Sequence, residues 1–549
     1  MRPGAGECNL RAIMTRGYRL GPRGPDRQAD PRAGPGSGKE MGTHMLDQTT
    51  THTLRAAEAA TATYDLVVIG AGIAGLNALH AAAAYLPRGA RVLLLDEKDR
   101  AGGMWNTAYD YVRLHQPHPM FTVGDMKWTW DKPATYLAGR DEIQAHLAGA
   151  LGPISDRLAL DLRLGHRVLS CEEIDTGAGH RARVAFHPMD DPENLETVEA
   201  ARAIYASGLD YRVPEPLKLT SEAVLSVTPQ DLRAALSARP RAPVYVVGGG
   251  KTGMDTILEA WAQDPARPVT LLAGEGTNFM NRTKYAPTGL NRWTSGAPFS
   301  GLLRDIARSF DGDNEKAMID HFRRTHATDP DTPNAGFLFG FQSEEEQARI
   351  AAGLTETLSE YLTDVTDTPA GPQMQLRSGA SRPVAPGAIF VNCTGSYFRT
   401  GALVEPRPAL SPQFTVLNIT PRDGFHYHTG VSGFFTTHLL YRDQLRGLGL
   451  YTIDYEALFR KSKNAFVGAA AAQAYMFHVT MVQTLPLALL DTCLLDLDRW
   501  YPLPRRLWWF LQLKRNAAAD LAHCRKVLDR VAERFDIPCK PLAPPEPVS

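Results

Sequence analysis

The stretch Asp-Leu-Val-Val-Ile-Gly-Ala-Gly-Ile-Ala-Gly at residues 65–75 decides the fold. Its short apolar run is typical of a buried parallel strand, and its glycines have the GxGxxG spacing that precedes a helix in dinucleotide-binding units. This spacing places Gly70 at a tight turn, Gly72 where backbone approaches a pyrophosphate, and Gly75 where helix and strand pack closely. The N–H groups at the helix start would face the phosphates. We therefore expect a dinucleotide-binding βαβ unit here.

A carboxylate follows the next predicted strand, at residues 91–95. Asp96 lies 26 positions after Gly70 and is expected to accept hydrogen bonds from ribose hydroxyls. The adjacent Glu97 is the competing choice, because the end of the strand cannot be placed to one residue.

The strand, glycine turn and helix pattern occurs a second time. An apolar run at residues 244–247 is followed by a glycine turn, Gly-Gly-Gly-Lys-Thr-Gly at 248–253, and by a predicted helix at 254–261. Gly248, Gly250 and Gly253 repeat the spacing, and Lys251 lies in the turn. Two such sites in one chain indicate an electron donor and an acceptor held close enough for hydride transfer. The fold class we expect is α/β, with two Rossmann-like dinucleotide-binding domains, one nested in the other, and a helical C-terminal extension.

The residues after Asp96 narrow the cofactor. The pair Gly102 and Gly103, followed by Trp105, stands where flavoproteins carry backbone past FAD, and this arrangement resembles the flavin-containing monooxygenase family. The segment at residues 111–117 and the helix start at 136–143 are similar to the plant auxin-forming branch of that family. The second glycine motif resembles the family's NADPH site. Residues 206–208 and 392–397 stand where the family has its two interdomain crossings, with Gly395 in the second.

The resemblance also implies roles for further residues. His115 and Gln116 take the place, by position alone, of polar residues beside the isoalloxazine, and they are weak candidates for a catalytic role. An ordinary turn histidine is an equally good interpretation of His115. Gly433 corresponds to the last FAD contact, or to a plain helix cap.

NADPH is favoured over NADH as the donor, mainly by the resemblance. Arg282 and Lys284 follow the strand at 269–272 and are expected to bind a 2′-phosphate, whereas Glu275 would read the ribose of NADH.

The two motifs and the resemblance divide the chain into segments. We expect a disordered N-terminal extension at 1–63, the first part of an FAD-binding domain at 64–210, an NAD(P)H-binding domain at 211–387 with an insertion at about 276–365, the second part of the FAD domain at 388–454, and a helical region at 455–549.

The activity that the resemblance implies is an FAD-dependent, NAD(P)H-using monooxygenase. Such an enzyme forms a C4a-(hydro)peroxyflavin and oxygenates a small organic substrate with dioxygen. Three alternatives stay open: a non-oxygenating FAD-dependent NAD(P)H:acceptor oxidoreductase, an N-hydroxylating monooxygenase, and a flavin-binding protein without turnover.

Composition excludes other classes. The chain has 549 residues, and 59 Lys and Arg balance 60 Asp and Glu, so no global charge favours nucleic acid. Six cysteines without CxxC or CxxxxC spacing exclude a disulfide reductase and favour the cytoplasm. No metal site is expected, since even the neighbouring His426 and His428 are interpreted as a polar pair.

The C-terminal region raises the question of a membrane. We expect no membrane span, because no 20-residue uncharged apolar stretch is recognised. Aromatic residues flanked by cations at 485–515 resemble interfacial anchors, but buried packing or a subunit contact is favoured over membrane-surface contact. The oligomeric state stays open.

Overall fold

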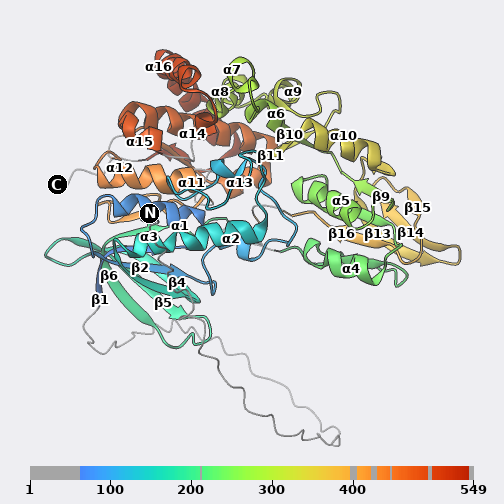
Figure 1. Cartoon of the computed structure of the whole chain (residues 1–549), viewed down its shortest axis with the longest axis horizontal. Coiled ribbons are helices and arrows are strands. Elements are labelled where there is room, and N and C mark those ends of the chain that lie inside the picture. The colour runs from blue at the N-terminus through green and yellow to red at the C-terminus, as the bar shows by residue number, and fades with distance from the viewer. Residues whose placement is uncertain are drawn as a thin grey trace, which may run out of the picture. The chain divides into compact units, whose positions relative to one another are not determined.

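The computed structural model describes residues 62–209, 213–395, 398, 405–421, 429–445, 448–492 and 497–542 (Figure 1). The predicted N-terminal extension lies outside these residues except at 62–63, which begin the first strand. His426 and His428 also lie outside them.

The first sheet is built around the strand that precedes the first glycine turn. Its order is β3 (Ala159–Leu164), β2 (Arg91–Asp96), β1 (Ala62–Ile69), β6 (Glu196–Tyr205), β5 (His180–Pro188) and β4 (His166–Asp175), and β17 (Val416–Asn418) also pairs with β6. β1 is parallel to β2 and β6, while β4 to β6 form an antiparallel meander. Alternate residues of β1 are buried on opposite faces: Leu66 and Val68 pack in the core with α1 (Ile73–Ala83), and Val67 and Ile69 pack with β5.

The second sheet is entirely parallel. Its order is β12 (Glu356–Leu358), β9 (Val269–Leu272), β8 (Val244–Val247), β16 (Ile389–Asn392) and β7 (Leu225–Val227), and α4 (Leu232–Ala238) and α5 (Lys251–Gln263) pack with it. A small antiparallel sheet of β13 (Leu362–Thr368), β14 (Gly371–Leu376) and β15 (Ser381–Pro383) accompanies it. The parallel strands β1, β2, β3, β6 and β17 of the first sheet and the entirely parallel second sheet confirm the predicted fold class.

One predicted boundary needs correction. We placed the return to the first domain at residue 388, but β16 lies between β8 and β7 in the second sheet. All four of its residues are buried there. The chain rejoins the first sheet only at β17.

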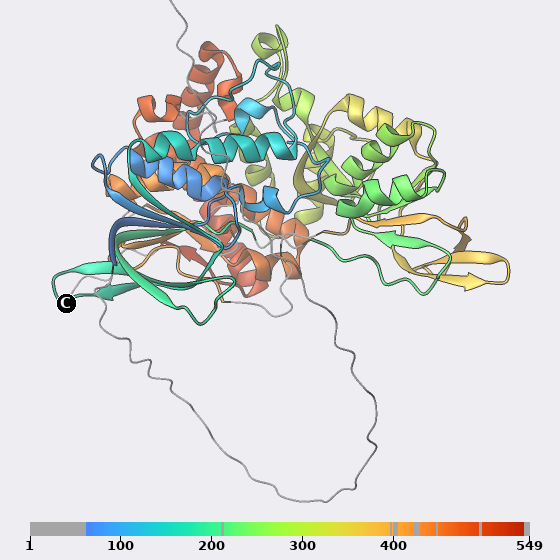
Figure 2. The same cartoon turned by 60° about the horizontal axis from the view of Figure 1, so that its bottom comes forward.

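The region around the predicted insertion contains short strands and helices. These are β10 (Thr277–Asn281), α6 (Arg282–Tyr285), α7 (Asn291–Thr294), α8 (Phe299–Ser309), α9 (Glu315–His326), β11 (Gly336–Gln342) and α10 (Glu344–Gly353). The C-terminal region is helical as expected, with α13 (Tyr455–Lys461), α14 (Lys463–Thr484), α15 (Leu487–Thr492) and α16 (Leu503–Phe535). Phe310, Phe322 and Phe466 belong to one core that both regions share. Figures 1 and 2 show α8 beside α14.

α14 contradicts part of the membrane prediction. Residues 464–484 carry no Asp, Glu, Lys or Arg, and α14 is the one helix of the described chain that is long and apolar enough to cross a membrane. However, 83% of its apolar window is buried inside the protein, where it packs against α8 and α16. The apolar composition of α14 is therefore explained by its burial in the protein interior.

Buried histidines predict how the fold responds to acid. His146 stacks on Trp128 with ring centroids 4.0 Å apart, and His438 is hydrogen-bonded to the Tyr85 hydroxyl. Burial, together with nearby positive charge, lowers the pKa of each histidine from 6.5 to about 4. As the pH falls, these two histidines therefore become protonated in the unfolded chain before they do so in the folded protein. Stability is complete above pH 6.5 and is lost as the pH falls towards 4, by about 3 kcal/mol for each histidine.

Calorimetry across this pH window checks the prediction. The Tm is expected to fall between pH 6.5 and 4.5, and His146→Gln should flatten the fall, whereas the exposed His180→Gln should leave it unchanged. A Tm that stays constant over this window would show that these histidines are protonated in the folded protein.

Candidate active site

The first glycine turn joins β1 to α1 and lies against the end of β6. Gly70 has a φ of +108°, and a Cβ there would lie 2.4 Å from the carbonyl oxygen of Ala206, just after β6. A Cβ on Gly75 would lie 1.7 Å from the carbonyl oxygen of Gly70. The protein itself therefore requires glycine at both positions. The turn lies at the carboxyl ends of β1 and β6, where open α/β sheets bind ligands.

Gly72 and Gly103 form a close approach of two backbones at the same turn. A Cβ on Gly72 would lie 3.3 Å from the Cα of Gly103, and a Cβ on Gly103 would lie 2.9 Å from the Cα of Gly72. Gly72 is also the N-cap of α1, whose first N–H groups have no partner within the helix. This bare backbone beside a helix N-terminus fits a pyrophosphate.

Asp96, and not Glu97, is the carboxylate that contacts the turn. Its Oδ2 accepts a hydrogen bond of 2.6 Å from the N–H of Ala71, and burial raises its pKa despite that bond. Glu97 is exposed and faces Arg167 at 3.6 Å. Asp96 therefore has the position expected for the group that accepts ribose hydroxyls.

Trp105 and Gly433 support the turn through packing. Trp105 is buried, with its ring centroid 5.7 Å from that of Phe121. Gly433 lies in a buried π-helical turn (Ser432–Thr436), between α11 (Thr429–Val431) and α12 (Thr437–Tyr441). A Cβ on Gly433 would lie 2.2 Å from the carbonyl oxygen of Ala74 in α1. The structure thus explains this glycine by helix packing.

The second glycine turn contains two glycines that protein packing requires and one that faces open space. Gly248 has a φ of +121° and would carry a Cβ 2.7 Å from the carbonyl oxygen of Cys393, after β16. A Cβ on Gly253 would lie 2.1 Å from the carbonyl oxygen of Gly248. Gly250, in contrast, has extended backbone and no protein atom within 4 Å of its Cβ position. Only Gly250 faces open space, which a bound nucleotide would fill. Gly395 is exposed just beyond β16.

Side chains from the first domain hold the second helix in place. The hydroxyl of Tyr109 donates to Asp255 of α5 at 2.9 Å, and the hydroxyls of Tyr111 and Thr256 share a hydrogen bond of 3.0 Å. Asp255 also forms an ion pair with Lys251 at the start of α5. These contacts fix the two glycine turns relative to each other.

His115 is held close to the second turn. Its carbonyl oxygen accepts a hydrogen bond of 3.0 Å from Arg282, whose guanidinium also pairs with Glu346 at 2.7 Å. Burial, followed by the positive charges of Lys251 and Arg282, lowers the pKa of His115 to about 3. The imidazole is therefore neutral at physiological pH.

Arg282 is not placed as we predicted. Its guanidinium bonds join the insertion to the backbone at His115, and Lys284 donates to the carbonyl oxygen of Thr325. Both cations are thus engaged in holding protein segments together. Glu275 is exposed after β9.

A cation that the sequence did not reveal stands at the end of β9. A Cβ on Gly249 would lie 3.1 Å from the carbonyl oxygen of Ala273, and Gly274 packs against the ring of Tyr361. The guanidinium of Arg377 lies 3.9 Å from the centroid of that ring. Arg377 follows β14, far along the chain, so only the tertiary fold brings it to the end of β9, the position at which dinucleotide-binding folds contact a ribose.

A cavity of about 540 Å³ lies between the first domain, the insertion and the C-terminal helices. His115 and Gln116 form part of its wall, and Val431 and Phe435 contribute from either side of Gly433. Most of the remaining lining is apolar and comes from the insertion and α14 to α16, including Phe299, Leu303, Phe339, Phe341, Ala470, Ala474, Met481, Leu503, Leu507 and Leu513. The cavity thus borders elements that pack on both glycine turns.

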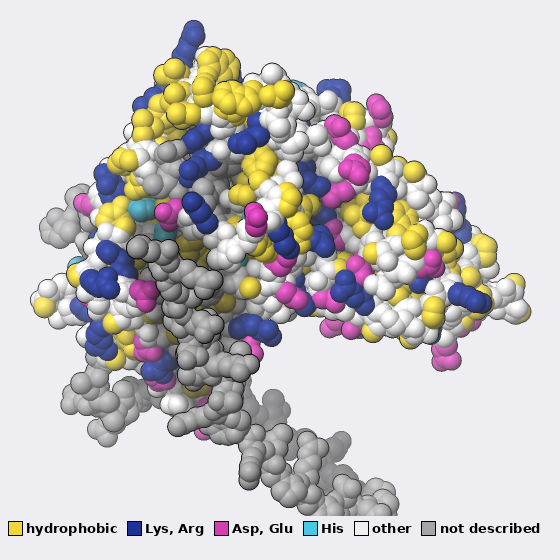
Figure 3. Space-filling view, viewed as in Figure 1, with side chains coloured by type: hydrophobic (Ala, Val, Ile, Leu, Met, Phe, Trp, Pro, Cys, Tyr) yellow, Lys and Arg dark blue, Asp and Glu magenta, His cyan; other side chains and the backbone are white. Residues whose placement is uncertain are grey.

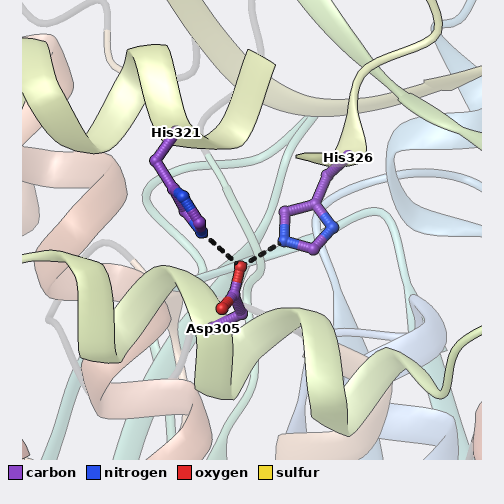
Figure 4. A group of neighbouring side chains, drawn as sticks. All are labelled: Asp305, His321 and His326. Carbon is purple, nitrogen blue, oxygen red and sulfur yellow. Dashed lines mark hydrogen bonds and ion pairs between the residues drawn. The ribbon is translucent and has the colours of Figure 1, made fainter. Parts of the chain in front are cut away.

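A group of potential metal ligands lies in the insertion (Figure 4). The Nε2 atoms of His321 and His326 each lie 2.6 Å from Oδ2 of Asp305, and His326 also bonds to the Tyr285 hydroxyl. Burial would raise the pKa of Asp305, but the two imidazoles outweigh this effect and lower it to about 2. Hydrogen bonding accounts for the grouping without an ion.

The cysteines of the described chain are free thiols. Cys393 is beside the second turn, and Cys171, Cys524 and Cys539 lie elsewhere. Burial raises the pKa of each to about 12, so a reactive thiolate is disfavoured.

Comparison with known proteins gives one family match and several partial relatives. Residues 64–282 match the family described as pyridine nucleotide-disulphide oxidoreductase. An uncharacterized protein of Mycobacterium tuberculosis (strain ATCC 25618 / H37Rv) is 31% identical over 206 residues, and the match covers 35% of this chain and 35% of that protein. The chain therefore matches about a third of the length of such curated relatives.

Solved structures with a similar chain course include enzymes of different activity. A flavin-containing monooxygenase from Stenotrophomonas maltophilia is 17% identical, with a TM-score of 0.41 over 70% of this chain and 98% of that one. An ornithine hydroxylase from Pseudomonas aeruginosa is 13% identical, with a TM-score of 0.43 over 69% and 99%. A bacillithiol disulfide reductase from Bacillus cereus is 12% identical, with a TM-score of 0.40 over 70% and 98%.

Proposed function

We propose that the protein is a cytoplasmic, FAD-dependent monooxygenase that uses NADPH and dioxygen to oxygenate a small organic substrate. The observation that carries this proposal is the position of the cavity. Val431 and Phe435 flank the glycine that packs on α1. Phe339 and Phe341 flank Gly340, where a Cβ would lie 3.8 Å from the Cβ of Lys251 at the start of α5. A substrate in the cavity would therefore lie beside both dinucleotide sites.

The two turns would hold different nucleotides. The backbones of Gly72 and Gly103 and the carboxylate of Asp96 fit FAD, and the open position at Gly250 fits the pyrophosphate of NADPH. Bound FAD would pass electrons from the nicotinamide to dioxygen. For a sulfide substrate the balance is sulfide, O₂, NADPH and H⁺ giving sulfoxide, NADP⁺ and water. The described cysteines, with their raised pKa values, favour this acceptor over a disulfide.

The lining of the cavity favours an apolar substrate. An apolar enclosure excludes water from the reaction. Asp498 and Arg506 also belong to the lining, so the N-hydroxylating alternative for amino-acid substrates stays open. The finer resemblance, to the plant auxin-forming branch, rests on residues 111–117 and 136–143. Within the first of these segments, His115 lines the cavity with a neutral imidazole.

Rapid mixing tests the activity. Protein reduced anaerobically with NADPH and then mixed with oxygenated buffer should show a transient absorbing in the near ultraviolet before the oxidised flavin spectrum returns. The transient should decay faster when NADP⁺ is removed, because the bound nucleotide shields the site from water. One-step reoxidation with rapid electron transfer to quinones would establish the acceptor oxidoreductase, and slow reoxidation by every acceptor would favour a binding protein.

Arg377 tests the choice of donor. If its guanidinium binds the 2′-phosphate, Arg377→Ala should raise KM for NADPH roughly tenfold, the loss of about one charge-assisted contact, and leave KM for NADH unchanged. Arg382→Ala is the matched control, because Arg382 lies on the same small sheet but pairs with Glu356. Equal changes for both nucleotides would remove Arg377 from the site.

A further inference from the structure

An apolar ridge is exposed around the first turns of α16. Leu503, Leu507 and Leu511 are spaced four residues apart on one helix face, and each is between 50% and 64% exposed. Trp508 is exposed beside them, and Leu487 of α15 is exposed as well. Figure 3 shows hydrophobic side chains gathered over α16, with Lys and Arg side chains around them. Monomeric soluble proteins rarely expose a contiguous apolar patch without a use for it.

α7 extends this ridge. Arg505 of α16 donates to the carbonyl oxygens of Arg292 and Ser295, which fastens α7 to α16. Leu290, just before α7, and Trp293, within it, are among the most exposed large apolar side chains of the described residues. The ridge therefore combines residues of the insertion with residues of the C-terminal helices.

Positive charge predominates around the ridge, although Asp498 lines the cavity beside it. Residues 499–519 contain no Asp or Glu, but they contain five cations: Arg499, Arg505, Arg506, Lys514 and Arg515. Lys514 lies 4.7 Å from the ring centroid of Phe510, and Arg505 lies 4.7 Å from that of Trp509. Exposed leucine and tryptophan among cations are the composition of segments that lie in the headgroup region of anionic membranes.

The cavity opens through this ridge. Leu487, Leu503 and Leu507 line the cavity, and the same three side chains are at least half exposed to solvent. A residue that is both lining and exposed marks a mouth. Any molecule entering here passes from the surface of the ridge directly into an apolar enclosure.

We propose that the ridge docks the protein on an anionic lipid surface, from which the cavity takes an apolar substrate. Our expectation for this segment was buried packing or a subunit contact; Leu507, Trp508 and Leu511 are exposed, so of these two a subunit contact is the competing use of the ridge. The choice of a lipid surface over a subunit rests on the cation cluster and on the open cavity mouth. Docking is independent of the catalytic cycle, whereas the substrate class rests on the proposed monooxygenase function.

Vesicle binding tests the docking without any turnover. The full-length protein should sediment with vesicles of phosphatidylcholine and phosphatidylglycerol, weakly with phosphatidylcholine alone, and less at high salt. A triple variant, Trp293→Gln, Trp508→Gln and Leu511→Gln, changes ridge residues outside the cavity lining and should bind at least roughly tenfold more weakly. Leu169→Gln with Leu195→Gln, two exposed leucines of the first domain, should bind as the unchanged protein does.

Substrate delivery tests the second half of the proposal. Oxidation of dodecyl methyl sulfide supplied in anionic vesicles should fall roughly fivefold or more in the triple variant, while oxidation of methyl phenyl sulfide from water stays unchanged. If the protein bound vesicles but oxidised neither sulfide, the proposed function would be wrong and the docking proposal would still hold.

Two results would overturn docking. The first is that the unchanged protein does not bind anionic vesicles, or that the triple variant binds them equally well. The second is a dimer in light scattering that the triple variant converts to monomers, with no vesicle binding by either. That result would assign the ridge to a subunit contact.

Discussion

Gly250→Val is expected to slow reduction of the flavin by NADPH on the order of 100-fold while leaving FAD bound. The extended backbone at Gly250 suits any residue, and no protein atom lies within 4 Å of its Cβ position. A valine therefore meets no protein at its Cβ, and the obstacle it creates is to the incoming pyrophosphate. Anaerobic stopped-flow reduction measures the effect.

Gly152→Val is the matched control for that experiment. Gly152 of α3 (Leu151–Ser155) likewise has open space at its Cβ position, and it is exposed, away from both turns. It should reduce at the normal rate. If Gly250→Val lost FAD and still bound nicotinamide normally, the two nucleotides would have to exchange places in our assignment.

Gly72→Val is expected to yield protein without flavin. A Cβ at Gly72 already lies 3.3 Å from the Cα of Gly103, so the valine branches would either displace that backbone or occupy the cradle between them. Both consequences remove the pyrophosphate contact. The absorbance ratio of flavin to protein after purification measures the loss, and calorimetry of the apoprotein checks that the fold persists. A yellow protein with full flavin content would place the FAD elsewhere.

The fold could be predicted from the sequence where the pattern is local. Residues 65–75 and 244–253 each combine an apolar strand, a glycine turn and a helix start, and these features depend on neighbours in sequence. The assignment of β16 failed because so short and mostly apolar a strand fits either sheet. Its register beside β8 is a tertiary fact. α14 was expected as part of the helical C-terminal region, but its uncharged run at residues 464–484 was not recognised, although the sequence shows it directly.

In the candidate site, too, residues fixed by local pattern could be predicted from the sequence and residues placed by tertiary contacts could not. Gly70, Gly75, Gly248 and Gly253 are required by backbone contacts within or beside each motif, so spacing alone located them. Arg282 was assigned from its distance along the chain after β9, but its bonds to Glu346 and to the backbone of His115 could not be predicted from spacing. Arg377 gave no local signal, because it reaches β9 only through its contact with Tyr361.

The shared core of α8 and α14 has a consequence for how substrate range changes among related proteins. The two helices come from segments far apart in the sequence, yet each buries its apolar face against the other. Replacing the insertion alone would leave α14 facing unmatched side chains, at a cost of several kcal/mol for each poorly filled site. New specificity would therefore be acquired by paired changes in the middle and at the end of the gene, while the two nucleotide-binding motifs, which precede the insertion, stay constant.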